Sequence, residues 1–179
     1  MTARTADTPP GRARTRGWAL AGLVLLVLLG LLYVFGAVND LAADAGGGIP
    51  VDHRGAYTAL TGTSFAHTAA SAPGIAAYVS TLETGYALHE LTFALLFLAI
   101  LLIPFRRRRW WAWWAAWVPM IANLGYTLTL GVHDPTILGR SLIADIALPV
   151  LLLAHLPAFL HRRDHGTPPP AAPCRMPSE

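Results

Sequence analysis

Two acidic residues, Glu90 and Asp145, lie inside long apolar stretches of this sequence. A carboxylate that faces hydrocarbon costs about 2 to 3 kcal/mol or more, so an acid inside a membrane segment is by default a candidate functional group. Two buried carboxyl groups could divide acid and base roles, one as proton donor and the other ionised. Glu90 and Asp145 are therefore the candidate catalytic residues.

Helical geometry places polar residues of four apolar stretches at a similar depth. Counted from the end of each stretch that lies nearest to arginine residues, Glu90, Asp145 and Tyr33 are each about 22 Å along a helix that rises 1.5 Å per residue. Asn123 is about 20 Å along its own helix. One polar side chain from each helix would then enter the same layer, where these side chains should face one another instead of lipid.

Tyrosines at helical spacing extend this polar layer toward one end of the bundle. Tyr86 precedes Glu90 by four residues, and Tyr126 follows Asn123 by three, so each pair shares a helix face. We therefore predict an outward-opening polar pocket lined by Tyr33, Tyr86, Glu90, Asn123, Tyr126 and Asp145. The alternative is that these polar side chains only join the helices, at about 0.6 to 2 kcal/mol per contact.

An ion pair is predicted near the outer rim, between Glu83 and Arg140. The two residues lie about 33 Å and 30 Å along their helices. Asp134 and Glu90 are alternative partners for Arg140.

Metal binding receives little support from the sequence. Several histidines and acids fall on the outer side and could supply zinc ligands, but His89 and Glu90 are adjacent and would point about 100° apart on a helix. Cys174 is the only cysteine, which excludes an intramolecular disulfide and a site with two thiolates. We expect no metal site and no cofactor.

Four stretches can position these residues, because each is long and apolar enough to cross about 30 Å of hydrocarbon as a helix of roughly 20 residues. They span residues 18–38, 85–105, 110–131 and 138–160, approximately. Pro119 should bend the third helix, since proline cannot donate to the carbonyl of Ala115. The predicted fold is an all-α integral membrane protein with a four-transmembrane-helix domain over residues 17–163.

The arginines predict how this bundle is oriented. All 13 basic residues are arginine, and nine of them stand in blocks at residues 12–16, 106–109 and 162–163 beside the apolar stretches. Since short arginine-rich loops stay in the cytoplasm, both termini should be cytoplasmic and residues 39–82 should lie outside the cytoplasmic membrane. In an alternative reading the first stretch is a cleaved signal peptide, but its apolar run is longer than the roughly 7 to 15 residues typical of one.

The flanking segments have simpler predictions. Residues 1–16 and 164–179 are rich in proline, threonine, alanine and arginine, and are expected to be disordered cytoplasmic tails. In the outer segment, glycines at 46–48 and Pro50 should end the first helix, and residues 52–65 should form a short interfacial helix. Pro73 suits the start of a helix that continues into the second span. This segment should form a small extracytoplasmic cap.

The composition favours a membrane protein over a soluble domain, because 54% of the 179 residues are apolar and only 13% are charged. Nucleic-acid binding is not expected, since the basic residues adjoin apolar stretches instead of a polar surface. Trp110, Trp111, Trp113 and Trp114 follow the central arginines, as expected of aromatic anchors at a membrane boundary.

No motif in the sequence names a reaction, and three functions remain open. The first is binding of a small amphiphile or lipid-like molecule in the polar pocket. The second is acid and base catalysis, such as isomerisation or cyclisation of a polyprenyl or sterol-like substrate. The third is a non-catalytic subunit or assembly factor. The predicted partners are the bilayer, a lipid-like molecule, and another membrane protein or a second copy of the chain.

Overall fold

A computed structural model describes residues 10–46 and 48–160, and its regular structure over these residues is entirely helical. Four segments are long and apolar enough to cross a membrane. They are Gly17–Ala45, Pro73–Phe105, Trp110–His133 and Pro135–Leu160. The expectation of an all-helical chain with four such segments is confirmed.

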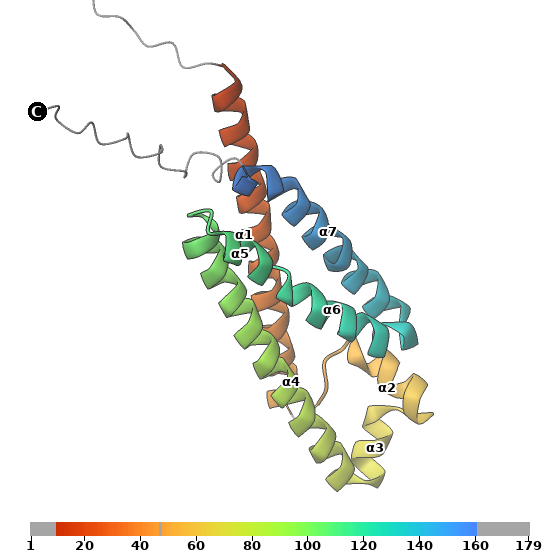
Figure 1. Cartoon of the computed structure of the whole chain (residues 1–179). Coiled ribbons are helices and arrows are strands. Elements are labelled where there is room, and N and C mark those ends of the chain that lie inside the picture. Colours follow the sequence, from red (N-terminus) through yellow and green to blue (C-terminus); the bar gives the residue numbers. More distant parts are fainter. Residues whose placement is uncertain (1–9, 47, 161–179) are drawn as a thin grey trace, which may run out of the picture.

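Helix α1 (Pro10–Ala45) is longer than predicted at both ends. It begins at Pro10, because proline fits the first position of a helix, so residues 10–16 are helical although they were expected in a disordered tail. It passes the predicted end at residue 38 and stops before the glycines at 46–48. α1 packs along α4 (Pro73–Ile100), as Figure 1 shows. Residues 1–9 and 164–179 lie outside the described chain.

Prolines set the irregular turns of the second and third long segments. A π-helical turn, η1 (Leu101–Phe105), contains Pro104 and ends α4, and the chain reverses through four arginines. Next come α5 (Trp110–Ala115) and α6 (Val118–Thr129), which are separated by a turn just before Pro119. The predicted bend at Pro119 is thus present as a break in the helix.

The fourth long segment, α7 (Pro135–Leu160), follows a short 3-10 helix, η2 (Gly131–His133). Asp134 caps α7, because its Oδ1 accepts hydrogen bonds from the backbone N–H groups of Thr136 (2.7 Å) and Ile137 (3.2 Å). The hydrogen bond from the Ile137 N–H, assisted by that from Thr136, holds the pKa of the Asp134 carboxyl below its usual value.

The cap consists of two short helices, α2 (His53–Thr61) and α3 (Phe65–Ser71), where the sequence predicted one. Gly62 ends α2 in the left-handed conformation (φ 72°), and the Ser64 side chain accepts a hydrogen bond from the His67 N–H at the start of α3. In Figure 1 the cap lies at the end of the bundle where α1 ends and α4 begins. It covers the end away from the arginine turn at 106–109.

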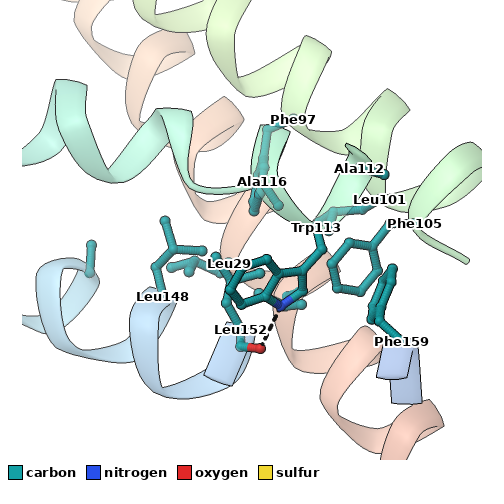
Figure 2. Packing of buried hydrophobic residues seen from close by; sticks show 12 residues of the cluster. Leu29, Phe97, Leu101, Phe105, Ala112, Trp113, Ala116, Leu148, Leu152 and Phe159 are labelled. Atoms are coloured by element: carbon teal, nitrogen blue, oxygen red, sulfur yellow. Dashed lines mark hydrogen bonds between the residues drawn. The ribbon is translucent and has the colours of Figure 1, made fainter. Parts of the chain in front are cut away.

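An apolar core fills the half of the bundle near that arginine turn. It is built from α1, α4, η1, α5 and α7, and Figure 2 shows its side chains. Trp113 lies inside this core, with only 5% of its surface exposed, and its Nε1 donates to the Leu152 carbonyl at 2.9 Å. The sequence predicted a boundary anchor at Trp113, but this side chain packs against α7 inside the bundle. Trp111 and Trp114 remain 57% exposed.

His155 is buried between α7 and α1. Its Nδ1 lies 3.0 Å from the Leu151 carbonyl oxygen and its Nε2 lies 2.9 Å from that of Ala19. Gly22 makes this approach possible, since a Cβ there would collide with the imidazole. The pair therefore locks α1 to α7.

Replacement of Gly22 by alanine should destabilise the fold by about 1 to 3 kcal/mol, because the added methyl group forces His155 out of its site. The measurement is thermal unfolding of the detergent-purified protein. Gly125→Ala in α6 is the matched control, since a Cβ at Gly125 meets nothing within 4 Å. Equal unfolding temperatures for the two variants would contradict the His155 lock.

Candidate functional site

A cavity of about 970 Å³ lies among α1, α4, α6 and α7, on the cap side of the apolar core. Its volume is at the upper end of the roughly 300 to 1,000 Å³ of small-molecule sites. Phe35 and Ile143 line it although they are 66% and 65% exposed. The cavity is therefore not enclosed, and part of its rim is formed by apolar side chains on the outer surface of the bundle.

The walls of this cavity change from apolar to polar in one direction along α1 and α4. On α1, Leu29 and Leu32 line the part near the core, and Asp40 lines the part near the cap. α4 runs the opposite way, and here Phe93 lies toward the core whereas Tyr86 lies toward the cap.

The same order holds on the other two helices. Along α6 it runs from Pro119 to Tyr126, and along α7 from Ala144 out to Arg140. The cavity thus has an apolar inner part and a polar part beside the cap.

Five of the six predicted pocket residues line this cavity. They are Tyr33, Tyr86, Glu90, Asn123 and Tyr126. Asp145 is not among the lining residues, although it is hydrogen-bonded to Asn123. The two acids that the sequence marked as catalytic candidates therefore do not share the cavity wall.

Asp145 joins α7 to α6. Its Oδ1 accepts from the Asn123 amide at 2.6 Å, and its Oδ2 accepts from the Thr127 hydroxyl at 2.8 Å. The Asn123 amide also donates to the Ser141 carbonyl at 3.2 Å. Asn123 and Asp145 are in contact, as their similar depths predicted. Both oxygens of the Asp145 carboxylate accept hydrogen bonds from side chains of α6.

Glu90 differs from Asp145 in that its carboxylate has no hydrogen-bond or ion-pair partner within residues 10–46 and 48–160. It lies against α1 at Gly36, where an added Cβ would be 3.6 Å from Oε1. Asp40, one turn beyond Gly36 on α1, also lines the cavity without such a partner in the described chain. Sequence analysis missed Asp40 because the first helix was expected to end near residue 38.

His53 of the cap closes the polar end of the bundle. It is 3% exposed, and its Nδ1 is 2.9 Å from Glu83 Oε2 on α4. Its Nε2 is 2.8 Å from the Tyr126 hydroxyl on α6. Tyr126 in turn stacks on Tyr86, with ring centroids 5.9 Å apart and planes 17° apart.

The charge on His53 is favoured by its acidic neighbours. Burial alone would lower the pKa of the imidazole, but the hydrogen bond and negative charge of Glu83, assisted by Asp40 and Asp52, outweigh burial and raise it. When His53 is protonated, it forms an ion pair with Glu83 between the cap and α4.

The predicted ion pair between Glu83 and Arg140 is not formed. Glu83 binds His53, and the Arg140 Nη1 is 2.9 Å from Asp52 Oδ2. Both actual partners come from the cap, which inserts residues 52 and 53 between the helix ends. A depth count along the spans omits this segment, so it could not predict either pair.

No group of three or more His, Cys, Asp or Glu side chains in the described chain is arranged to hold a metal ion. Comparisons of the chain with protein-family models, with curated proteins and with solved structures found no match. The site itself must therefore supply the argument for function.

Replacement of Asp145 by alanine should lower the free energy of unfolding by about 1 to 3 kcal/mol, because Asn123 and Thr127 lose their common acceptor. Chemical unfolding in mixed micelles measures this loss. Ile146→Ala, which truncates a neighbouring side chain that is 61% exposed, is the control. If Asp145→Ala lowers the free energy of unfolding less than Ile146→Ala does, the prediction that the hydrogen bonds of Asp145 stabilise the fold is contradicted.

The raised pKa of His53 predicts a pH-dependent stability. A group whose pKa is higher in the folded protein stabilises it fully below the unfolded value of about 6.5, and this contribution is lost as pH rises through the folded value. The difference in melting temperature between wild type and His53→Gln should therefore be largest at acidic pH and shrink toward alkaline pH. A difference that grows with pH would contradict the assignment of the ion pair.

Proposed function

We propose that this chain is a multi-pass protein of the cytoplasmic membrane whose outward-opening pocket binds a small amphiphile. The observation that carries this proposal is the 970 Å³ cavity whose walls change from apolar to polar toward the cap. An amphiphile has the same division, with an apolar tail and a polar head. The exposed apolar side chains of Phe35 and Ile143 on the cavity rim give such a molecule a route from the surrounding lipid.

Membrane insertion is supported by the outer surface of the long helices. Large apolar side chains that the rest of the described residues leave exposed continue along α1 and α4, whereas soluble proteins rarely expose extended apolar patches. Examples from α1 are Leu20, Val24, Leu28, Leu31 and Phe35. The arginines at 106–109 lie at the end opposite the cap, which the positive-inside rule assigns to the cytoplasm.

Joint acid and base catalysis by Glu90 and Asp145 is less well supported than binding. Asp145 accepts two hydrogen bonds from α6 and does not line the cavity, so a bound molecule would meet Glu90 without Asp145. A general acid or base must come within about 2.6 to 3.2 Å of the proton it transfers, directly or through one water.

The orientation can be tested by cysteine labelling in a Cys174→Ser background. Ala59→Cys in the cap should react with a membrane-impermeant maleimide in intact cells, whereas Arg106→Cys should react only after permeabilisation. Both positions are exposed on the protein, so a difference in labelling reports the membrane side. The reverse pattern would contradict the proposed orientation.

Occupation of the cavity can be tested by filling it. Ala122→Trp places an indole on the cavity wall, and Ala154→Trp makes the same change at an exposed position of α7 that does not line the cavity. Fractions of a native lipid extract that raise the melting temperature of wild type should do so for Ala154→Trp and fail for Ala122→Trp. Equal stabilisation of both variants would place the bound molecule elsewhere.

A further inference from the structure

The polar part of the cavity is acidic. Four carboxyl groups line it, from Asp40, Asp52, Glu90 and Asp134, whereas Arg140 is the only arginine on its wall within the described chain. The Arg140 guanidinium is committed to Asp52 at 2.9 Å. Asp134 is committed to the N-terminus of α7.

Asp40 and Glu90 thus have no hydrogen-bond or ion-pair partner among the described residues, although His53 of the cap lies near enough to act on both through space, and both line the same cavity. The Glu90 carboxylate rests on Gly36, and Asp40 follows Gly36 by one helical turn on the same face of α1. Two carboxylates that line one cavity repel each other when both are ionised. A cation placed between them would relieve that repulsion, whereas an anion would add to it.

Aromatic rings complete this part of the wall. Tyr86 precedes Glu90 by one turn of α4 and stacks on Tyr126, and both rings line the cavity. Aromatic faces beside carboxylates are the surroundings in which ammonium groups bind, through the ring quadrupole and the negative charge together. The adjoining apolar part, with Leu29 and Phe93, suits a hydrocarbon tail and gives no support for a free inorganic cation.

We propose that the amphiphile bound in this cavity carries an ammonium head group, held between Asp40 and Glu90 with its tail in the apolar part. This inference rests on the proposed binding function. The same head-group chemistry occurs in long-chain amines and in amine-bearing phospholipids.

The test compares three molecules with the same sixteen-carbon chain: hexadecylamine, hexadecanol and palmitate. Each is titrated into the full-length protein in a non-ionic detergent, and the dissociation constant is read from intrinsic tryptophan fluorescence and checked by thermal shift. Wild type should bind hexadecylamine at least about tenfold more tightly than hexadecanol, as expected of one charge-assisted contact, and palmitate most weakly.

Isosteric variants assign this preference to the two carboxylates. Asp40→Asn and Glu90→Gln should each reduce the preference for amine over alcohol about tenfold while hexadecanol binding stays unchanged. Asp44→Asn is the matched control, because Asp44 lies one turn after Asp40 on α1, is 5% exposed and does not line the cavity. It should keep the wild-type preference.

The outcomes separate this inference from the binding function on which it rests. Equal affinity for hexadecylamine and hexadecanol, or tighter binding of palmitate, overturns the ammonium head group and leaves amphiphile binding intact. Failure of all three molecules to bind overturns both. Competition by phosphatidylethanolamine but not by its N-acetyl derivative identifies a lipid head group as the source, and no competition by either, with hexadecylamine bound, identifies a free long-chain amine.

Discussion

The structure depends on one constraint: helices that expose apolar side chains outward must direct their ionisable side chains toward one another. α1, α4 and α7 carry few acidic groups along their length, and those few lie on the cap side of the core. Asp145, Glu90 and Asp40 are the clearest cases, since each would be costly against hydrocarbon. The result is a bundle with two halves. Apolar packing around Trp113 stabilises one half, and the other half is polar and contains the cavity.

The cap completes the polar half instead of only covering it. His53 reaches Glu83 and Tyr126 on two different helices, and Asp52 binds Arg140 on a third. α2 therefore ties together the helix ends that surround the cavity mouth. A short segment outside the long helices thus determines which carboxylates are neutralised and which remain available to a ligand.

Much of this arrangement could be predicted from the sequence, because hydrophobic runs and a fixed rise per residue determine span and depth. These rules placed Asn123 beside Asp145, and the missing N–H of Pro119 predicted the break in the third span. These rules failed where a contact is made by the cap, which lies outside the four long helices. The partners of Glu83 and Arg140 come from the cap.

Two further misses have local causes. Asp40 was overlooked because α1 extends past its apolar run. The burial of His155 was not predicted, because it depends on Gly22, which lets α1 approach α7 closely. Neither the end of a helix nor the close approach of two helices can be predicted from hydropathy alone.

The central claim is that the cavity holds a small amphiphile, and native mass spectrometry of the protein released from its own membranes tests this most directly. Wild type should carry an adduct with the mass of one small lipid-like molecule, and the cavity-filling variant Ala122→Trp should not. An adduct-free wild type, or the same adduct at equal occupancy on both proteins, would contradict the account.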